Sequence, residues 1–221
     1  MKARVTAKGD LCCYNNARGD GKVFSFDLLE SVDGEIRVTC SNVVVDCFYG
    51  VIEVEKVYLI SKGSLKPAQK NFNHLKNQWE IFLEANLIME HCPNEDGSIA
   101  RQQFSIRPIS EIENVENDTI LDAIRIVITV NPSVPIMRKN GMETQRRILN
   151  LKYSSGKSVE LTLWGELCNK EGQLLQEMLD SGSYPVLAVK SGKVNDFSGK
   201  SIRTISSTQL FIIQIFRRHV D

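Results

Sequence analysis

Three aromatic residues stand in polar surroundings, where their rings could stack on flat ligands. Phe72 lies in the stretch Lys70-Asn-Phe-Asn73, and Phe197 lies in Asn195-Asp-Phe-Ser198. Trp164 ends a run in which apolar and polar residues alternate. Each base that stacks on an exposed ring contributes about 1–3 kcal/mol, while nearby cations pair with phosphates. Exposed aromatics beside basic residues are therefore typical of a surface that binds single-stranded nucleic acid.

Basic residues occur near these aromatics in both halves of the sequence. Lys66 precedes Phe72, and Lys193 precedes Phe197. The segments that we expect to form loops contain further cations, at Arg18, Lys22, Arg138, Lys139, Arg146 and Arg147. The 221 residues include 27 Lys and Arg and 27 Asp and Glu, so the formal net charge is zero. A nucleic-acid role therefore depends on cations gathered along one groove, because the chain lacks the bulk charge of a strongly basic binder.

Each of these residues also has a plainer explanation. Phe72 or Phe197 could fold back onto its own loop, and Trp164 could pack between the two halves. Arg146-Arg147 could be a solvated pair, and Arg37 could be an ordinary surface residue. The recurrence of aromatic and basic residues at matching places in both halves favours the binding interpretation.

The sequence shows no pattern for catalysis, a metal site or a cofactor. The six cysteines form no CxxC pair, and the three histidines add no metal-ligand spacing. There is no glycine-rich phosphate loop, and no pair of carboxylates is spaced as an acid and a base. We therefore expect a protein that is not an enzyme and that holds neither metal nor cofactor.

The ends of the sequence bear on its compartment. Its first residues are polar and lack the apolar segment of a signal peptide, and scattered cysteines fit a reducing compartment. The apolar run 210–216 is far shorter than the ~20 residues of a membrane span. These features predict a soluble intracellular protein without membrane contact.

Alternation with a period of two residues predicts the elements that position the aromatics. Two such runs, 23–28 and 36–40, form a hairpin, and a second hairpin follows at 148–153 and 159–163. Each hairpin precedes a stretch with helical spacing, at 43–49 and 172–179, and then another strand. In the second helix, Leu174, Leu175, Met178 and Leu179 form an apolar stripe.

This order of elements predicts an all-β protein made of two tandem OB-folds. An OB-fold is a five-stranded Greek-key barrel, and here each barrel has a short helix between its third and fourth strands. Matching positions such as Ser41 and Trp164 recur about 120 residues apart, which indicates an internal duplication. We expect a first OB-fold DNA-binding domain at 1–103, a linker at 104–115, and a second at 116–221 that ends in a divergent tail.

Alternation also predicts which side chains leave the barrels. In the second copy Val159, Leu161 and Leu163 point inward, while Ser158, Glu160, Thr162 and Trp164 point outward. In the first copy Ile36, Val38 and Cys40 point inward, while Glu35, Arg37, Thr39 and Ser41 share the outer face. OB-folds bind oligonucleotides on this face of strands 2 and 3, between two flanking loops.

At these residues the chain resembles the family of replication protein A large subunits. The resemblance runs from Ala3 to about Gln209 and covers that family's two central DNA-binding OB domains. Its most specific stretches are Arg18-Gly-Asp-Gly-Lys22, Gly34-Glu-Ile-Arg37, Ser61-Lys-Gly-Ser-Leu-Lys66, Thr162-Leu-Trp-Gly-Glu166 and Val194-Asn-Asp-Phe-Ser-Gly199. One of these motifs alone is a weak signal, but together they are specific.

The resemblance implies roles for ten residues. In the first domain it implies that Phe72 stacks on a base and that Arg18, Arg37, Lys66 and Glu80 line the groove. In the second it implies that Trp164 and Phe197 stack, while Arg138, Arg146 and Lys193 contact phosphates or bases.

The sequence also departs from the family pattern. Ser41 replaces the first domain's other stacking Phe, Cys12 replaces an Arg, and Tyr14 replaces a Trp. We therefore expect weaker binding by the first domain. The family's N-terminal interaction domain and its zinc-bearing third domain have no counterpart here, so the chain is expected to be a shortened relative. Because the family's third domain serves subunit assembly, the sequence leaves open whether the family's smaller subunits still associate with this chain.

Two functions remain open at this point. The first is single-stranded DNA binding with little sequence preference, in the nucleus, during DNA replication, repair and recombination. Its partners would be DNA and other replication and repair proteins. The second is a degenerate OB-fold module for protein interaction or regulation, with weakened DNA binding. The neutral charge and Ser41 favour the second, whereas the repeated aromatics favour the first.

Overall fold

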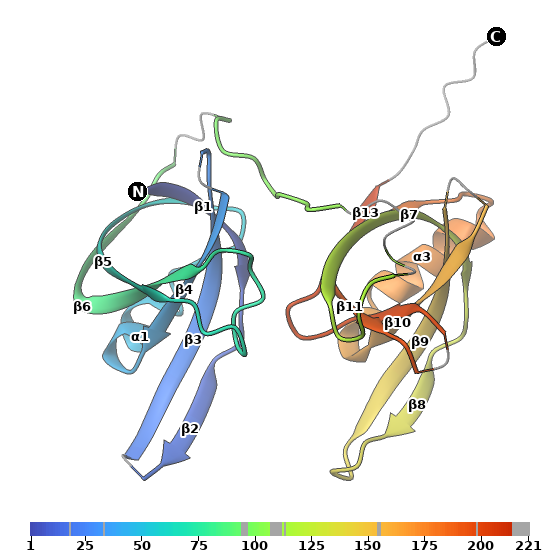
Figure 1. Ribbon diagram of the computed structural model, residues 1–221, viewed down its shortest axis with the longest axis horizontal. Helices are drawn as coiled ribbons and strands as arrows, with labels where there is room; N and C mark the ends of the chain where they lie inside the picture. The colour runs from blue at the N-terminus through green and yellow to red at the C-terminus, as the bar shows by residue number, and fades with distance from the viewer. Residues whose placement is uncertain are drawn as a thin grey trace. The chain divides into compact units, whose positions relative to one another are not determined.

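The protein consists of two compact units, Met1–Gln103 and Phe104–Asp221, and each is described by itself (Figure 1). The structure is a computed structural model that describes residues 1–17, 19–32, 34–93, 97–106, 112, 114–153, 156–197 and 199–213. Arg18, much of the expected linker and the tail 214–221 lie outside these residues.

The first unit is a closed barrel with one short helix. Its strands are β1 (Lys2–Lys8), β2 (Cys12–Asn16), β3 (Gly19–Glu30), β4 (Gly34–Ser41), β5 (Val57–Pro67) and β6 (Trp79–His91), and α1 covers Val43–Phe48. The strand order is β1-β5-β6-β4-β3-β2, and pairing of β1 with β3 closes the barrel. β4 and β6 run parallel, and the other neighbours are antiparallel.

The second unit repeats this arrangement with different strand lengths. Its strands are β7 (Ile120–Val130), β8 (Val134–Met137), β9 (Glu143–Lys152), β10 (Ser158–Trp164), β11 (Val186–Asn195), β12 (Ser201–Arg203) and β13 (Gln209–Ile213). A 3-10 turn, η1 (Gly165–Cys168), precedes α3 (Glu171–Asp180). The order β10-β12-β11-β7-β9-β8 closes through β10–β9, and β13 adds to β11.

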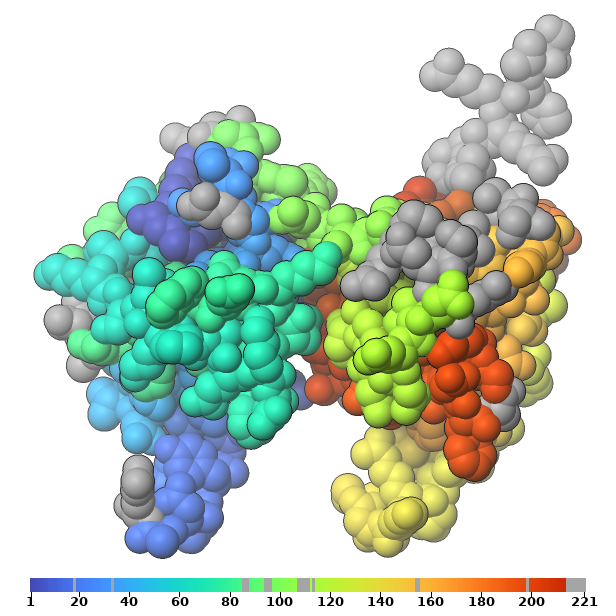
Figure 2. All heavy atoms as spheres, viewed as in Figure 1, coloured from blue at the N-terminus to red at the C-terminus, as the bar shows by residue number. Residues whose placement is uncertain are grey.

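The predicted fold class, two tandem OB-folds, is confirmed. In the first unit β1 is followed by a short strand, β2, that pairs with the tip of β3. In the second unit β7 is followed by a short strand, β8, that pairs with the tip of β9. The sequence pattern did not predict these extensions, which form hairpins that project from the barrels in Figures 1 and 2. Both helices lie between the third and fourth barrel strands, as expected, and no helix in the described ranges is long and apolar enough to cross a membrane.

Alternating side chains fill each barrel. Leu161, Leu163, Val38 and Cys40 are fully buried and Val159 nearly so, as the period-2 pattern predicted, whereas Ile36 is only partly buried. In α3 the expected apolar stripe is narrower than its four residues. Leu175 and Met178 are buried, whereas Leu174 is 49% exposed.

A register shift marks the fourth barrel strand of each unit, against β6 in the first and against β7 in the second. The register shifts between Ser61 and Gly63 in β5 and between Val189 and Gly192 in β11. A Cβ on either glycine would lie 2.7 Å from an isoleucine methyl, Cγ2 of Ile81 or of Ile202. Only glycine lets these strands approach so closely, and the bulge bends the strand around the barrel.

The residues near the division of the chain are tied to their own units. Arg4 donates hydrogen bonds to the main-chain oxygens of Ile99 and Ala100, within the first unit. In the second unit the Ser105 N–H donates to Asp122 at 2.7 Å, and the Phe104 ring packs edge-on against Phe211.

Candidate nucleic-acid interface

Strand register defines the outer face of the first barrel. Asp27 on β3 pairs with Arg37 on β4, Arg37 with Glu80 on β6, and Glu80 with Lys66 on β5. Directly paired residues on neighbouring strands point to the same side of a sheet. Three predicted site residues, Arg37, Glu80 and Lys66, therefore lie in one row across the outer face.

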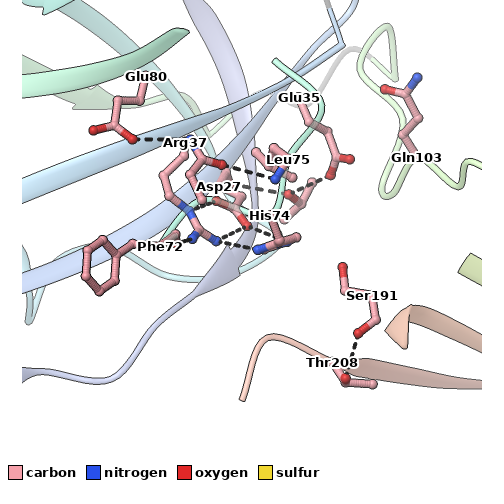
Figure 3. A network of polar contacts seen from close by, with 12 residues as sticks. Asp27, Glu35, Arg37, Phe72, His74, Leu75, Glu80, Gln103, Ser191 and Thr208 are labelled. Atoms are coloured by element: carbon pink, nitrogen blue, oxygen red, sulfur yellow. Dashed lines mark hydrogen bonds and ion pairs between the residues drawn. The ribbon is translucent and has the colours of Figure 1, made fainter. Parts of the chain in front are cut away.

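Arg37 is the anchor of the loop that carries Phe72. Its guanidinium forms a bidentate ion pair with Asp27, with Nε–Oδ1 and Nη2–Oδ2 distances of 2.8 and 3.0 Å. It also donates to the main-chain oxygen of Phe72 and lies 3.0 Å from His74 Nδ1 (Figure 3). Because Asp27 is almost fully buried, this pair fixes the loop to the barrel wall.

Further hydrogen bonds from side chains hold the loop of Phe72 in place. Glu80 is only 8% exposed, and its Oε2 accepts a hydrogen bond from Asn73 Nδ2 at 3.2 Å. Lys70 Nζ donates to the main-chain oxygens of Leu75 and Asn77. The Phe72 ring itself is 78% exposed and points away from the Arg37 guanidinium (Figure 3). The alternative in which Phe72 folds back onto its own loop is therefore wrong.

Two other cations of the first unit, Lys66 and Lys22, already have intramolecular partners. Lys66 Nζ lies 3.7 Å from the centre of the Phe82 ring, which faces the same side of the sheet. Lys22, expected in a loop, lies in β3 and pairs with Asp46 at 2.9 Å. Ser41 and Val23 end this face as a cross-strand pair. Arg18 lies outside the described residues.

In the second unit, register brings Trp164 and two arginines to one face. Val134, Arg146 and Trp164 form a row across β8, β9 and β10. One row beyond, Thr144 pairs with Ile136, and Arg138 Nη2 lies 3.4 Å from Thr144 Oγ1. Arg138, Arg146 and Trp164 therefore share the outer face of the β8–β9 hairpin and β10.

Two expectations for this face need correction. Trp164 is only partly exposed, so its ring is less open than expected. Arg147, expected beside Arg146 in a basic loop, lies in β9 and is 6% exposed. Its guanidinium donates to the main-chain oxygens of Asn131 and Cys168, at 2.7 and 3.1 Å, because alternation turns it to the opposite side from Arg146.

The segment before β7 anchors the loop of Phe197. Lys200 Nζ donates to the Val115 oxygen and pairs with Asp196 at 2.8 Å, and the Asp196 N–H donates to Asn117 Oδ1. The ring of Phe197 is 94% exposed. Phe197, like Phe72, therefore projects from a loop whose main chain is held in place.

Lys193 lies in a row that the sequence pattern did not reveal. Thr162 on β10 pairs with Arg203 on β12, and Arg203 pairs with Lys193 on β11. Both cations contact Asp118, with Nζ–Oδ1 and Nη2–Oδ1 distances of 3.0 and 3.3 Å. The hydrogen bond from Lys193, reinforced by Arg203, lowers the pKa of the Asp118 carboxyl below its ordinary value.

The two units do not place their charges in equivalent rows. The row of Arg37, Glu80 and Lys66 corresponds by register to Glu160, Ser201 and Asn195. The row of Arg203 and Lys193 corresponds to Phe82 and Ser64. Lys66 and Lys193, which looked like counterparts in the sequence, are therefore offset by one row.

Within the described ranges, no group of three or more His, Cys, Asp and Glu side chains is placed to hold a metal ion. The arrangement offers exposed rings and cations, which suit flat, anionic ligands.

Comparison with known proteins identifies relatives along nearly the whole chain. Residues 109–213 match the family described as Replication protein A OB domain. The chain is 74% identical over 212 residues to a 70 kDa DNA-binding subunit of replication protein A from Arabidopsis thaliana. It is 37% identical over 213 residues to the 70 kDa DNA-binding subunit from Xenopus tropicalis. Each match covers 96% of this chain but 33% of the relative, so the chain spans about a third of their length.

A solved structure shows the same fold. The chain matches a chain of a replication protein A heterotrimer bound to ssDNA with a TM-score of 0.68 and 36% identity. The match covers 98% of this chain and 49% of that one.

Proposed function

The chain belongs to the family of replication protein A large subunits, and we propose that it binds single-stranded DNA with little sequence preference and without catalysis. Bases would stack on Phe72, Trp164 and Phe197, while Lys66, Arg138, Arg146 and Lys193 would pair with phosphates. Stacking accepts any base because every base has a flat face. The alternative, an OB-fold module that serves only protein interaction, predicts that these rings are dispensable for DNA binding.

The observation that carries this proposal is the exposure of two phenyl rings on anchored loops. Phe72 and Phe197 are 78% and 94% exposed, although hydrogen bonds fix the main chain beside each of them. Leaving a large apolar ring in water gains nothing for folding, and ordering its loop costs conformational entropy. A pre-ordered ring does reduce the entropy lost when a base stacks on it.

Family membership supports the biological setting of the proposal. Relatives are named as DNA-binding subunits of replication protein A, and a structural neighbour was solved with ssDNA. We extend this to the present chain as a role in DNA replication, repair and recombination in the nucleus. Other replication and repair proteins are the expected partners, and assembly with smaller subunits is not part of the proposal.

Fluorescence anisotropy with labelled oligo-dT tests the stacking mechanism. The double variant Trp164→Ala, Phe197→Ala should lose more affinity than Phe72→Ala, because it removes two stacks rather than one. Each stack contributes about 1–3 kcal/mol, so each lost stack raises Kd about fivefold or more.

Tyr184→Ala provides the matched control. Tyr184 is 62% exposed but lies between α3 and β11, at the end of β11 away from Phe197. Its replacement should leave Kd unchanged. If the wild type binds oligo-dT no better than the stacking variants do, the rings do not contribute to DNA binding. That result would favour the protein-interaction alternative.

A further inference from the structure

Asp118 bridges two cations on the outer face of the second barrel. Its Oδ1 lies 3.0 Å from Lys193 Nζ and 3.3 Å from Arg203 Nη2. The Asp118 side chain is 56% exposed, and those of Arg203 and Lys193 are 40% and 28% exposed. All three groups therefore remain within reach of a ligand in solvent.

The Arg203 guanidinium is incompletely satisfied by this contact. Arginine has five N–H donors in a planar fork that matches carboxylates and phosphates. Only Nη2 contacts Asp118, and Nε is buried without a hydrogen-bond partner among the described residues. Arg146 Nε on β9 and Arg125 Nε on β7 are likewise buried without a partner there. The Arg203 guanidinium therefore keeps N–H donors that its contact with Asp118 does not use.

We propose that Arg203 and Lys193 form a phosphate-binding pair, and that the Asp118 carboxylate occupies the phosphate position until a DNA strand displaces it. This inference rests on the proposed function and adds to it a contact residue, Arg203, and an internal competitor, Asp118. In the free protein the carboxylate neutralises one of the two cations. A backbone phosphate supplies the same charge with more acceptor oxygens.

The main chain around Asp118 permits such an exchange. The Asp118 N–H donates to the Val194 oxygen at 2.9 Å, and Asn117 is tied to the Phe197 loop through Asp196. The backbone is therefore held independently of the ion pairs, and displacement of the carboxylate would also break the hydrogen bond of 3.2 Å that its Oδ2 accepts from Asn117 Nδ2. The site lies one strand from Trp164, because Arg203 pairs with Thr162 two residues before it. A strand whose base stacks on Trp164 would bring its phosphates near Arg203.

The first unit has no equivalent of this pair. At the matching register positions it has Phe82 and Ser64, neither of which is charged. The proposed site is therefore particular to the second unit, and changes to it should leave contacts of the first unit untouched.

Two single variants and their combination test the proposal, with oligo-dT as the probe in fluorescence anisotropy. Arg203→Gln should weaken binding about tenfold, since hydrogen bonds to charged groups are strong. It should also make the negative slope of log K against log salt shallower by about 0.7, the value for one phosphate contact on a single strand. Asp118→Asn should tighten binding, because the competing carboxylate is removed. In the Asp118→Asn background, Arg203→Gln should cost more affinity than in the wild type.

Asp180→Asn is the matched control for loss of one negative charge. Asp180 is an exposed carboxylate at the end of α3 in the same unit and accepts a hydrogen bond from Gln176. Tightening by Asp118→Asn but not by Asp180→Asn supports local competition. Equal tightening by both would show a general charge effect and overturn the proposal.

A purely structural role for Asp118 makes the opposite prediction. If the ion pairs only fasten the segment before β7, Asp118→Asn should lower the melting temperature and weaken or leave unchanged the binding of DNA. Exposed ion pairs stabilise little, so we expect both variants to fold, which circular dichroism would verify. If the Trp164 and Phe197 variants lose affinity while Arg203→Gln binds as the wild type does, this inference is wrong but the proposed function stands. If the wild type does not bind oligo-dT, the proposed function fails with it.

Discussion

Replacing Arg37 with lysine should loosen the Phe72 loop while keeping the positive charge. Arg37 binds both Asp27 oxygens, the Phe72 main-chain oxygen and His74. A lysine ammonium cannot reproduce this planar fork, because its three donors share one atom. We expect the free energy of unfolding of the first unit to fall by about 2–3 kcal/mol, since each hydrogen bond to a charged group contributes about 1.5–3 kcal/mol.

The same change should weaken DNA binding through Phe72. If the loop is mobile in the free protein, DNA binding includes the entropic cost of ordering it. This cost offsets most of the about 1–3 kcal/mol that stacking on Phe72 contributes. If Arg37 acts only by positioning Phe72, then Arg37→Lys should have little effect in a Phe72→Ala background. A double-mutant cycle should therefore give a coupling energy equal in magnitude to nearly the whole effect of Arg37→Lys on the wild type.

Anisotropy titrations of the wild type, the two single variants and the double variant measure this coupling. They should be run well below the melting temperature of each variant, with circular dichroism as the check on folding. Arg101→Lys, at an exposed arginine of the same unit, is the matched control and should not change Kd. Additive losses in the cycle would mean that Arg37 contacts DNA independently of Phe72, and would refute the positioning role.

Two further predictions concern β4. Ser41→Phe places a ring in the row that corresponds to Trp164 and should lower Kd about fivefold or more; an unchanged Kd in the same titration would contradict this assignment of the row. Burial raises the pKa of the neighbouring Cys40 thiol to about 12 from 9.0. Between these values the folded state binds more protons than the unfolded state, so the free energy of unfolding should fall as pH rises. Urea denaturation at pH 7.5 and about pH 10 should show a smaller loss in Cys40→Ala than in the wild type, and equal losses would exclude this thiol as the cause.

The sequence predicted the barrels because strands such as β4 and β10 alternate with a period of two. That rule identified Leu161 and Leu163 as interior residues, and the structure buries both. Applied one strand earlier, it would also have turned Arg147 inward, because Arg147 alternates in phase with the buried Leu149 and Leu151. Its charge suggested a surface position instead. The aliphatic part of an arginine can line a barrel end when carbonyl oxygens satisfy its guanidinium.

The loop anchors could not be predicted in the same way. Arg37 and the Phe72 oxygen are 35 residues apart, and Lys200 and the Val115 oxygen are 85 apart, so no local pattern connects either pair. Arg203 was missed for another reason. The strand that carries it, β12, is only three residues long, which is too short to display alternation.

The two units reach a similar loop geometry with different chemistry, and this bears on which unit attracts DNA. In the first unit Arg37 forms an ion pair with Asp27, and Lys22 forms one with Asp46. Lys66 makes a cation–π contact with Phe82. In the second, Arg138 and Arg146 have no ion-pair partner among the described residues, and Arg203 and Lys193 share a single carboxylate. Cations that are not already paired contribute most to phosphate binding, because they need not give up an internal partner. The second unit, which also keeps both of its aromatics, should therefore supply most of the affinity, while the first adds the stack of Phe72 through the tether between them.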